Sequence, residues 1–157
     1  MADGGKEKSF DVRDPDFEQR VRGSFARQGL MSTLGAVMTH VSPGCVDVEM
    51  PFDEALSQQH GFFHAGGIGS IADTAGGYAA ATLYGPEDGV LTVEFKLNLI
   101  APADGDMLVA RGQVVRPGRT LTVATGEVLV RKDGVLRPCA LMQQTLMRIV
   151  GRNGIIG

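Results

Sequence analysis

The segment HGFFHAGGIGSIADTAGGYAAATL, residues 60–83, carries the residue types in this chain that are best suited to chemistry. Asp73 is the single carboxylate in an otherwise apolar run, and an unpaired carboxylate is costly to bury. At the wall of a cleft, such a carboxylate can act as a general base or as a nucleophile. A structural hydrogen bond or ion pair would also account for Asp73, so the residue by itself leaves both interpretations open.

His64 and Ala65 stand just before a predicted helix over residues 66–83. A helix N-terminus presents unpaired backbone N–H groups and partial positive charge, and it can therefore hold a developing oxyanion. Asp73 would lie about 13 Å further along by helical rise, so the two features meet only if the preceding loop folds back. His64 could equally serve as a helix cap or lie at the surface.

One side of the predicted helix is almost bare of side chains. This stripe consists of Gly66, Gly69, Ser70, Asp73, Gly76, Gly77 and Ala80. An interior glycine costs about 0.8–1 kcal/mol of helix stability relative to alanine, so something must approach the backbone closely in return. A neighbouring helix, a partner subunit, a ligand or tight internal packing would each satisfy this condition.

Hydrophobic periodicity and turn residues predict the elements that position these side chains. We expect a helix over residues 14–29, with Asp14 as its cap, Pro15 at its first position and Gly29 at its end. Two strands follow, with a turn at residues 42–44. After the glycine-rich helix come four strands, at residues 91–99, 107–115, 120–131 and 139–149. The first of these alternates strictly, which predicts Val93, Phe95, Leu97 and Leu99 on one face and Thr92, Glu94, Lys96 and Asn98 on the other.

Short turns between strands favour antiparallel neighbours, and one long apolar helix needs cover on most sides. Both requirements predict an α+β fold in which a curved antiparallel sheet wraps around one long central helix. The chain has 157 residues, which favours one domain. We place that domain at residues 14–150, with a flexible lead at residues 1–13 and a tail at residues 151–157.

The composition excludes several classes of function. The net charge of −3 gives no concentrated positive face for nucleic acid. The first residues lack the apolar region of a secretion signal, and residues 66–83 contain Asp73, Ser70 and five glycines, which makes them a poor membrane span. Cys45 and Cys139 form no CxxC motif, so we expect buried free thiols in a reducing, cytoplasmic setting, with no metal and no cofactor.

Three segments together carry a family resemblance. Residues 60–83, VLTVEFKLNLIAPADGD at 90–106 and VVRPGRTLTVATGEVLV at 114–130 resemble the hotdog-fold acyl-CoA thioesterases. The resemblance is to the PaaI-type, phenylacetate-pathway branch of the 4-hydroxybenzoyl-CoA thioesterase superfamily, and it spans roughly residues 34–148. Its distinguishing pattern is Gly61 three residues before His64, a small residue and glycine after it, and Asp73 nine residues on.

The resemblance implies a role for each matching residue in the hydrolysis of an acyl-CoA thioester. Asp73 would be the base or nucleophile, and His64 falls on the family's histidine. The N–H of Ala65, where the family usually has glycine, would hold the thioester oxygen. Gln58, where the family often has asparagine, would supply a side-chain amide, with Gln59 an equally plausible occupant. The Thr92 hydroxyl would help to place the attacking water.

The resemblance also implies how the substrate and a second subunit would be bound. Arg116, Gly118 and Arg119, in the turn between two late strands, would contact the CoA nucleotide, with the arginines holding its phosphates. The remaining residues expected to bind substrate are glycines: Gly61, Gly66 and Gly77. Subunits of this family usually join their sheets edge to edge with the active site at the dimer interface, so we expect a homodimer or homotetramer paired through residues 91–99.

Two other functions fit the same fold class. Hotdog proteins include hydratases and dehydratases of acyl thioesters, but those have a proline-rich approach to the helix that GFFHAGG lacks. A module that senses acyl-CoA without cleaving it would be joined to a DNA-binding segment. Only about 30 weakly basic residues precede the expected fold, and Asp73 is retained. Release of free thiol from an acyl-CoA separates hydrolysis from both alternatives.

Overall fold

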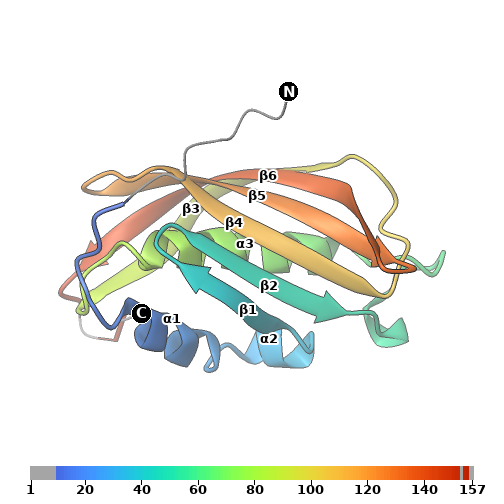
Figure 1. Ribbon diagram of the computed structural model, residues 1–157, viewed down its shortest axis with the longest axis horizontal. Coiled ribbons are helices and arrows are strands. Elements are labelled where there is room, and N and C mark those ends of the chain that lie inside the picture. Colours follow the sequence, from blue (N-terminus) through green and yellow to red (C-terminus); the bar gives the residue numbers. More distant parts are fainter. Residues whose placement is uncertain (1–9, 153, 156–157) are drawn as a thin grey trace.

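The computed structural model describes residues 10–152, 154 and 155 and consists of one curved sheet around one long helix (Figure 1). The sheet has six antiparallel strands in the order β1-β2-β4-β5-β6-β3. The strands are β1 (Val37–Ser42), β2 (Cys45–Pro51), β3 (Asp88–Leu99), β4 (Met107–Arg116), β5 (Leu121–Lys132) and β6 (Val135–Val150). The helices are α1 (Phe17–Phe25), α2 (Gly29–Thr33), the 3-10 helix η1 (Glu54–Leu56) and α3 (Ala65–Ala81). The predicted α+β architecture is confirmed.

The central helix α3 lies very close to the middle of the sheet because two paired strand residues have no side chains. Gly112 of β4 pairs with Gly126 of β5. A Cβ on Gly112 would come within 2.3 Å of the backbone of Ala75, and one on Gly126 would lie 3.5 Å from the carbonyl oxygen of Ala72. The backbone of the helix therefore rests directly on the backbone of the sheet, which fixes the depth of α3 in the fold.

The N-terminal helix differs from its prediction at both ends. It begins at Phe17, so Pro15 lies before it, and it ends at Phe25, so Gly29 instead begins the short helix α2. The Asp14 carboxylate does not cap α1. It accepts from the Asp16 N–H and forms an ion pair with Arg20 at 2.7 Å. The Arg20 hydrogen bond lowers the pKa of Asp14.

The same Arg20 guanidinium joins the N-terminal segment to the far end of the central helix. It donates to the carbonyl oxygens of Ala81 and Tyr84, at 3.1 and 3.2 Å. These carbonyls lie at or just beyond the end of α3, where helical acceptors lack partners and a positive charge is favourable. Arg20 thus fastens α1 to the C-terminal end of α3.

Strand β3 does not alternate as strictly as its sequence predicts. Its register against β6 shifts between Thr92 and Glu94, which marks a β-bulge. Thr92 pairs with the buried Leu146, and Phe95 pairs with the buried Gln144. Paired residues in an antiparallel sheet share a face. The bulge therefore places Thr92 on the helix-facing side with Phe95, whereas the alternation predicts Val93 there.

The ends of the described chain pack against the domain. Phe10, in the predicted lead, contacts the hydrophobic core and approaches Gly44, and Ile155, in the predicted tail, lies against Gly89. Residues 1–9, 153, 156 and 157 lie outside the described residues. In the part that the structure describes, no helix has both the length and the hydropathy needed to cross a bilayer.

The two cysteines lie on different strands. Cys139 of β6 is buried, its thiol donates to the Val128 carbonyl, and burial raises its pKa to about 11. Cys45 of β2 is only partly buried, which differs from the expectation that both thiols lie in the core.

Candidate active site

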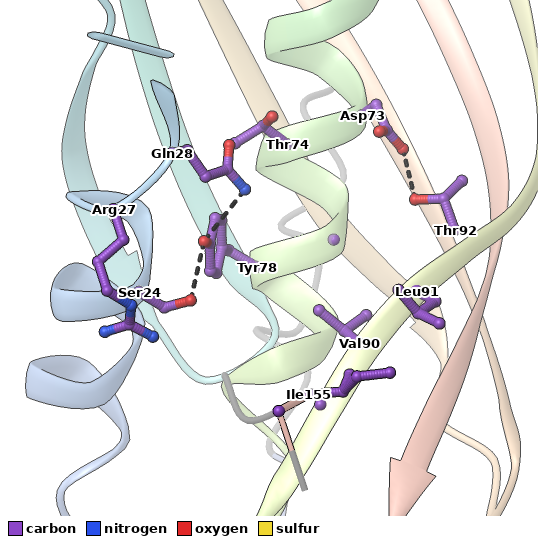
Figure 2. Close-up of a pocket in the computed structure, with 13 residues that line it drawn as sticks. Ser24, Arg27, Gln28, Asp73, Thr74, Tyr78, Val90, Leu91, Thr92 and Ile155 are labelled. Carbon is purple, nitrogen blue, oxygen red and sulfur yellow. Dashed lines mark hydrogen bonds between the residues drawn. The ribbon is translucent and has the colours of Figure 1, made fainter. Parts of the chain in front are cut away.

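The carboxylate of Asp73 projects from the middle of α3 towards β3 (Figure 2). Its Oδ1 accepts a hydrogen bond of 2.8 Å from the Thr92 hydroxyl. The side chain is half-buried, and this burial raises the pKa of Asp73, while the Thr92 hydrogen bond partly opposes the rise. No ion pair with Asp73 occurs among the described residues, and the Thr92 hydroxyl is the one hydrogen-bond donor to its carboxylate among them.

Asp73 and Thr92 form one side of a pocket of about 440 Å³. Gly77, one helical turn after Asp73, also lines it. Figure 2 shows Tyr78 on the other side of the helix, pointing towards Ser24 and Gln28. The Tyr78 hydroxyl is hydrogen-bonded to the Ser24 hydroxyl at 3.0 Å and accepts from the Gln28 amide at 3.1 Å.

Burial raises the pKa of Tyr78, so its hydroxyl is neutral at physiological pH. Arg27, which follows α1, is exposed and brings a positive charge to the same pocket. The pocket therefore has a carboxylate on one side and a neutral hydrogen-bonding network with one cation on the other.

The N-terminus of α3 forms a second, separate region. His64 is the N-cap residue, and its Nδ1 accepts from the N–H of Gly66 at 2.8 Å. Among residues 10–152 we find no acceptor for the N–H of Ala65, the first residue of the helix. This donor, at the positive end of α3, has the chemistry needed to bind a carbonyl oxygen.

Gln58 lies beside this helix start, in a pocket of about 470 Å³ that Ala65 also lines. Its backbone N–H donates to Phe62, its carbonyl accepts from Gly61, and its side-chain oxygen accepts from the N–H of His60. These bonds close a tight turn in which Gly61 has a φ of 80°, a left-handed conformation that favours glycine. Gly61 is exposed and shapes this turn.

The site residues predicted from the sequence thus fall into two places within one chain. Asp73, Thr92 and Gly77 line the first pocket, whereas Gln58 and Ala65 line the second. Asp73 comes eight residues after Ala65 along the helix, a rise of about 12 Å. The loop before α3 does not fold back to bring the two together.

The other predicted binding residues lie outside both pockets. The N–H of Gly66 is already bonded to His64. Arg116, at the end of β4, is exposed, as are Gly118 and Arg119 in the turn between β4 and β5. A Cβ on Gly118 would come within 2.0 Å of the Leu121 carbonyl oxygen, so this glycine is required by the turn itself.

Comparison with known proteins places the chain in a family. The family model of the thioesterase superfamily matches residues 60–136. The crystal structure of a thioesterase family protein from Silicibacter pomeroyi shares 51% sequence identity, covers 86% of this chain and 99% of its own, and superposes with a TM-score of 0.85. The chain belongs to the thioesterase superfamily. This thioesterase is therefore an enzyme that acts on thioesters, and its predicted hotdog fold is confirmed.

Two more distant structures share the fold of this thioesterase. A thioesterase from Haemophilus influenzae is 20% identical, covers 94% of this chain and 96% of its own, and has a TM-score of 0.75. The E. coli PaaI protein from the phenylacetic acid degradation operon is 23% identical, covers 87% of this chain and 95% of its own, and also has a TM-score of 0.75. In the described part of this thioesterase, no three His, Cys, Asp or Glu side chains gather in a group that could hold a metal ion.

Sequence reasoning missed residues around Asp73 that the structure of the thioesterase brings together. Ser24 and Gln28 reach the pocket from the segment that spans α1 and α2, and no sequence motif connects them to Tyr78. Gln144 of β6 is buried beneath α3 and donates to the backbone carbonyl of Asp73. A signal for Gln144 was present, because it is polar at an inward position between Met142 and Leu146.

Proposed function

We propose that this thioesterase hydrolyses an acyl-CoA to a free acid and CoA, with Asp73 as the catalytic carboxylate. The observation that carries the proposal is the environment of the Asp73 carboxylate: its burial, its hydrogen bond and its pKa. Asp73 is half-buried at the wall of a pocket, is held at one oxygen by Thr92, and has a raised pKa. A carboxylate that is partly desolvated and has one oxygen uncommitted is a stronger base and nucleophile than a solvated one.

Two routes use the same arrangement. In one, the uncommitted oxygen of Asp73 attacks the thioester carbonyl, CoA leaves as a thiolate, and water then hydrolyses the acyl anhydride. In the other, Asp73 takes a proton from water while the water oxygen attacks the carbonyl, and the thiolate leaves as the tetrahedral intermediate collapses. Both routes require an ionised Asp73 and a donor to the carbonyl oxygen, for which the Ala65 N–H is suited.

A second copy of the chain would bring that donor to Asp73. Strand β3 is a sheet edge, and large apolar side chains along it are exposed, including Phe95 at 52% and Leu99 at 53%. The first pocket lies at the start of β3, beside Thr92, and the second lies at its end, beside Leu99. If two β3 strands pair antiparallel about a two-fold axis, the first pocket of one protomer faces the partner's second pocket.

The nucleotide end of CoA carries phosphates, and the exposed turn between β4 and β5 offers two arginines for them. Arg116 and Arg119 form no ion pair with any described residue, so their guanidinium groups are available to an anionic ligand. Charge-assisted bonds between guanidinium and phosphate are among the stronger polar contacts in proteins. We therefore assign the phosphates of CoA to this turn.

The test is a panel of acyl-CoA thioesters, both alkyl and aryl, with a free-thiol readout for wild type and Asp73→Asn. We expect wild type to release CoA and Asp73→Asn to lower kcat by about 10²–10⁴-fold, the range for a positioned acid–base group. Glu87→Gln, an exposed carboxylate in the turn before β3, is the matched control and should retain wild-type kcat. Near wild-type hydrolysis by Asp73→Asn would refute the proposed role of Asp73.

The same variant reports on stability. Between the ordinary pKa of aspartate and the raised value in the folded protein, the folded state binds more protons than the unfolded state. Wild-type stability therefore falls as pH rises through that window. Asp73→Asn has no carboxyl to ionise and so avoids this fall in stability, and its Tm at pH 7 should equal or exceed that of wild type. A Tm measurement therefore separates lost activity from lost folding.

A further inference from the structure

Gln144 is a buried amide on an otherwise apolar surface. It lies in the middle of β6, is 1% exposed, and projects towards α3 between the buried side chains of Met142 and Leu146. Its Nε2 donates to the backbone carbonyl of Asp73 at 3.2 Å. Its Oε1 is buried and meets no hydrogen-bond donor among the described residues.

Stability does not explain this amide. A buried acceptor without a donor destabilises the folded state, and an apolar side chain of the same length would avoid that penalty. The Asp73 carbonyl does not need Gln144 either, because the α-helical pattern already supplies it with the N–H of Gly77. Because the unpaired Oε1 of Gln144 destabilises the core, we look for the role of this residue in the contact that its Nε2 makes with the backbone of Asp73.

The helix backbone is shaped to receive the amide. A Cβ on Gly76 would lie 2.7 Å from the amide carbon of Gln144 and 2.8 Å from both its nitrogen and its oxygen. The whole amide group therefore lies flat against the bare backbone at Gly76. This contact accounts for one of the helix glycines that the sequence left unexplained, since any side chain at Gly76 would displace the amide.

The contact between Gln144 and the backbone of Asp73 also connects α3 to the β3–β6 part of the sheet. Gln144 pairs with Phe95 and Leu146 pairs with Thr92 in the β3–β6 ladder, so Gln144 belongs to the same sheet segment as Thr92. One bond from this segment reaches the backbone of Asp73, through Gln144, and another reaches its carboxylate, through Thr92. The two bonds together fix both the position and the orientation of the carboxylate.

We propose, on the basis of the function proposed above, that Gln144 is a positioning residue that holds the turn of α3 carrying Asp73 at the distance from β3 where Thr92 meets the carboxylate. Its amide does not touch the substrate and acts through Asp73. Without the amide, the helix is still covered by apolar packing, but the hydrogen bond between Thr92 and Asp73 is no longer held at its length.

The test is Gln144→Met, which keeps the length and bulk of the side chain and removes both the donor and the unsatisfied acceptor. We expect Tm to equal or exceed that of wild type, kcat to fall about 10-fold and KM to change by less than about 3-fold, since a small misplacement of a catalytic group acts mainly on kcat. Met142→Leu, on the same strand and the same face, is the matched control and should keep wild-type kcat.

The pH profile provides a readout that a purely structural role would not move. Weakening the Thr92 bond removes the contact that lowers the pKa of Asp73, so the acidic limb of kcat/KM should shift to higher pH in Gln144→Met. Among the described residues that line the pocket, the other ionisable side chains are Arg27, after α1, and Tyr78 of α3, while β3 contributes only uncharged residues. None of these is altered by the substitution.

A second variant keeps the proposal testable if Gln144→Met does not fold. Gly76→Ala does not substitute Gln144, but the added Cβ displaces its amide from the helix backbone. We expect the same loss of kcat and the same shift of the acidic limb. Wild-type kcat and an unmoved limb in either folded variant would overturn the proposal, as would a loss of kcat accompanied by a lower Tm and an unmoved limb. A fully active Asp73→Asn would instead refute the role of Asp73, which keeps the two failures distinct.

Discussion

At the scale of single residues, the two oxygens of Asp73 are in different situations. Oδ1 accepts from Thr92, while Oδ2 has no hydrogen-bond partner among the described residues. Burial raises the pKa of the carboxyl and increases its basicity, and the Thr92 bond opposes that rise and so favours the ionised form. If Asp73 acts as proposed, the Thr92 hydroxyl lowers the basicity of the carboxylate and at the same time raises the fraction of it that is ionised.

This balance predicts the pH dependence of Thr92 variants. The proposed mechanism requires ionised Asp73, so kcat/KM should fall as pH drops through the raised pKa. Thr92→Val removes the bond that lowers this pKa, so the acidic limb should move to higher pH and kcat/KM above the limb should fall about 10- to 100-fold, the range for a bond to a charged group. Thr92→Ser keeps a hydroxyl and should resemble wild type. An unchanged limb in Thr92→Val, measured from kcat/KM between pH 4 and 8, would contradict the expectation.

Ala65 allows one backbone donor to be deleted with little change in shape. It is the first residue of α3, where proline is well tolerated, and His64 before it already has the extended conformation, φ −70° and ψ 140°, that proline requires of its predecessor. Ala65→Pro should therefore fold with nearly unchanged Tm and lower kcat about 10²–10³-fold, the range for loss of one oxyanion donor. Ala65→Ser retains the N–H and is the control. Unchanged kcat in Ala65→Pro, with Tm followed by calorimetry, would rule out this donor.

At the scale of elements, the depth of α3 in the sheet depends on Gly112. A Cβ at this residue would meet the carbonyl carbon and oxygen of Ala75 at 2.3 Å, and backbone cannot move aside as a side chain can. We expect Gly112→Ala to lower the free energy of unfolding by about 1–3 kcal/mol, the range for overpacked cores. Gly23→Ala, in α1 with nothing within 4 Å, should instead raise it by about 0.5–1 kcal/mol through helix propensity. Urea titration measures both, and equal effects of the two substitutions would contradict this account.

The order and type of the central helix and the six strands were predictable from the sequence because each depends on local periodicity and turn residues, whereas the short helices α2 and η1 were not predicted. The bulge in β3 was not, because the alternation of residues 92–99 is satisfied equally well without it and only pairing with β6 reveals the shift. The true ends of α1 were also hidden. Asp14 and Gly29 are suitable capping residues, but Asp14 is bound by Arg20, a tertiary contact that outweighs local preference.

For the candidate site, the family resemblance predicted Asp73, Thr92 and the start of α3, and the structure places Asp73 and Thr92 at one pocket and Ala65 at another. It gave no account of Gln144, Ser24 or Gln28, because these residues reach Asp73 or its pocket only through packing between elements distant in the sequence. The alternating pattern Met142, Gln144, Leu146 is the one sequence signal that could have directed attention to β6.

At the scale of the whole molecule, the two candidate pockets of one chain lie near opposite ends of an exposed sheet edge. Asp73 and the N–H of Ala65 line different pockets, and β3 runs from one pocket to the other. The edge has apolar side chains exposed to a degree that sheet edges in monomers usually avoid. In the proposed arrangement, pairing of two edges about a two-fold axis would cover these side chains and bring the first pocket of each chain to the second pocket of its partner.

Mixed dimers of two inactive variants would test this arrangement. In an Asp73→Asn protomer paired with an Ala65→Pro protomer, one site receives both substitutions and the other receives neither, provided that each site draws on both chains. Random mixing during co-expression would then restore about one quarter of the wild-type specific activity, because half of the dimers are mixed and each has one intact site. If each site instead lay within one chain, every site in the mixture would carry one substitution and activity would stay at the level of the separate variants. Differently tagged chains, purified in sequence on both tags, isolate the mixed dimer, whose kcat per dimer should be about half that of wild type.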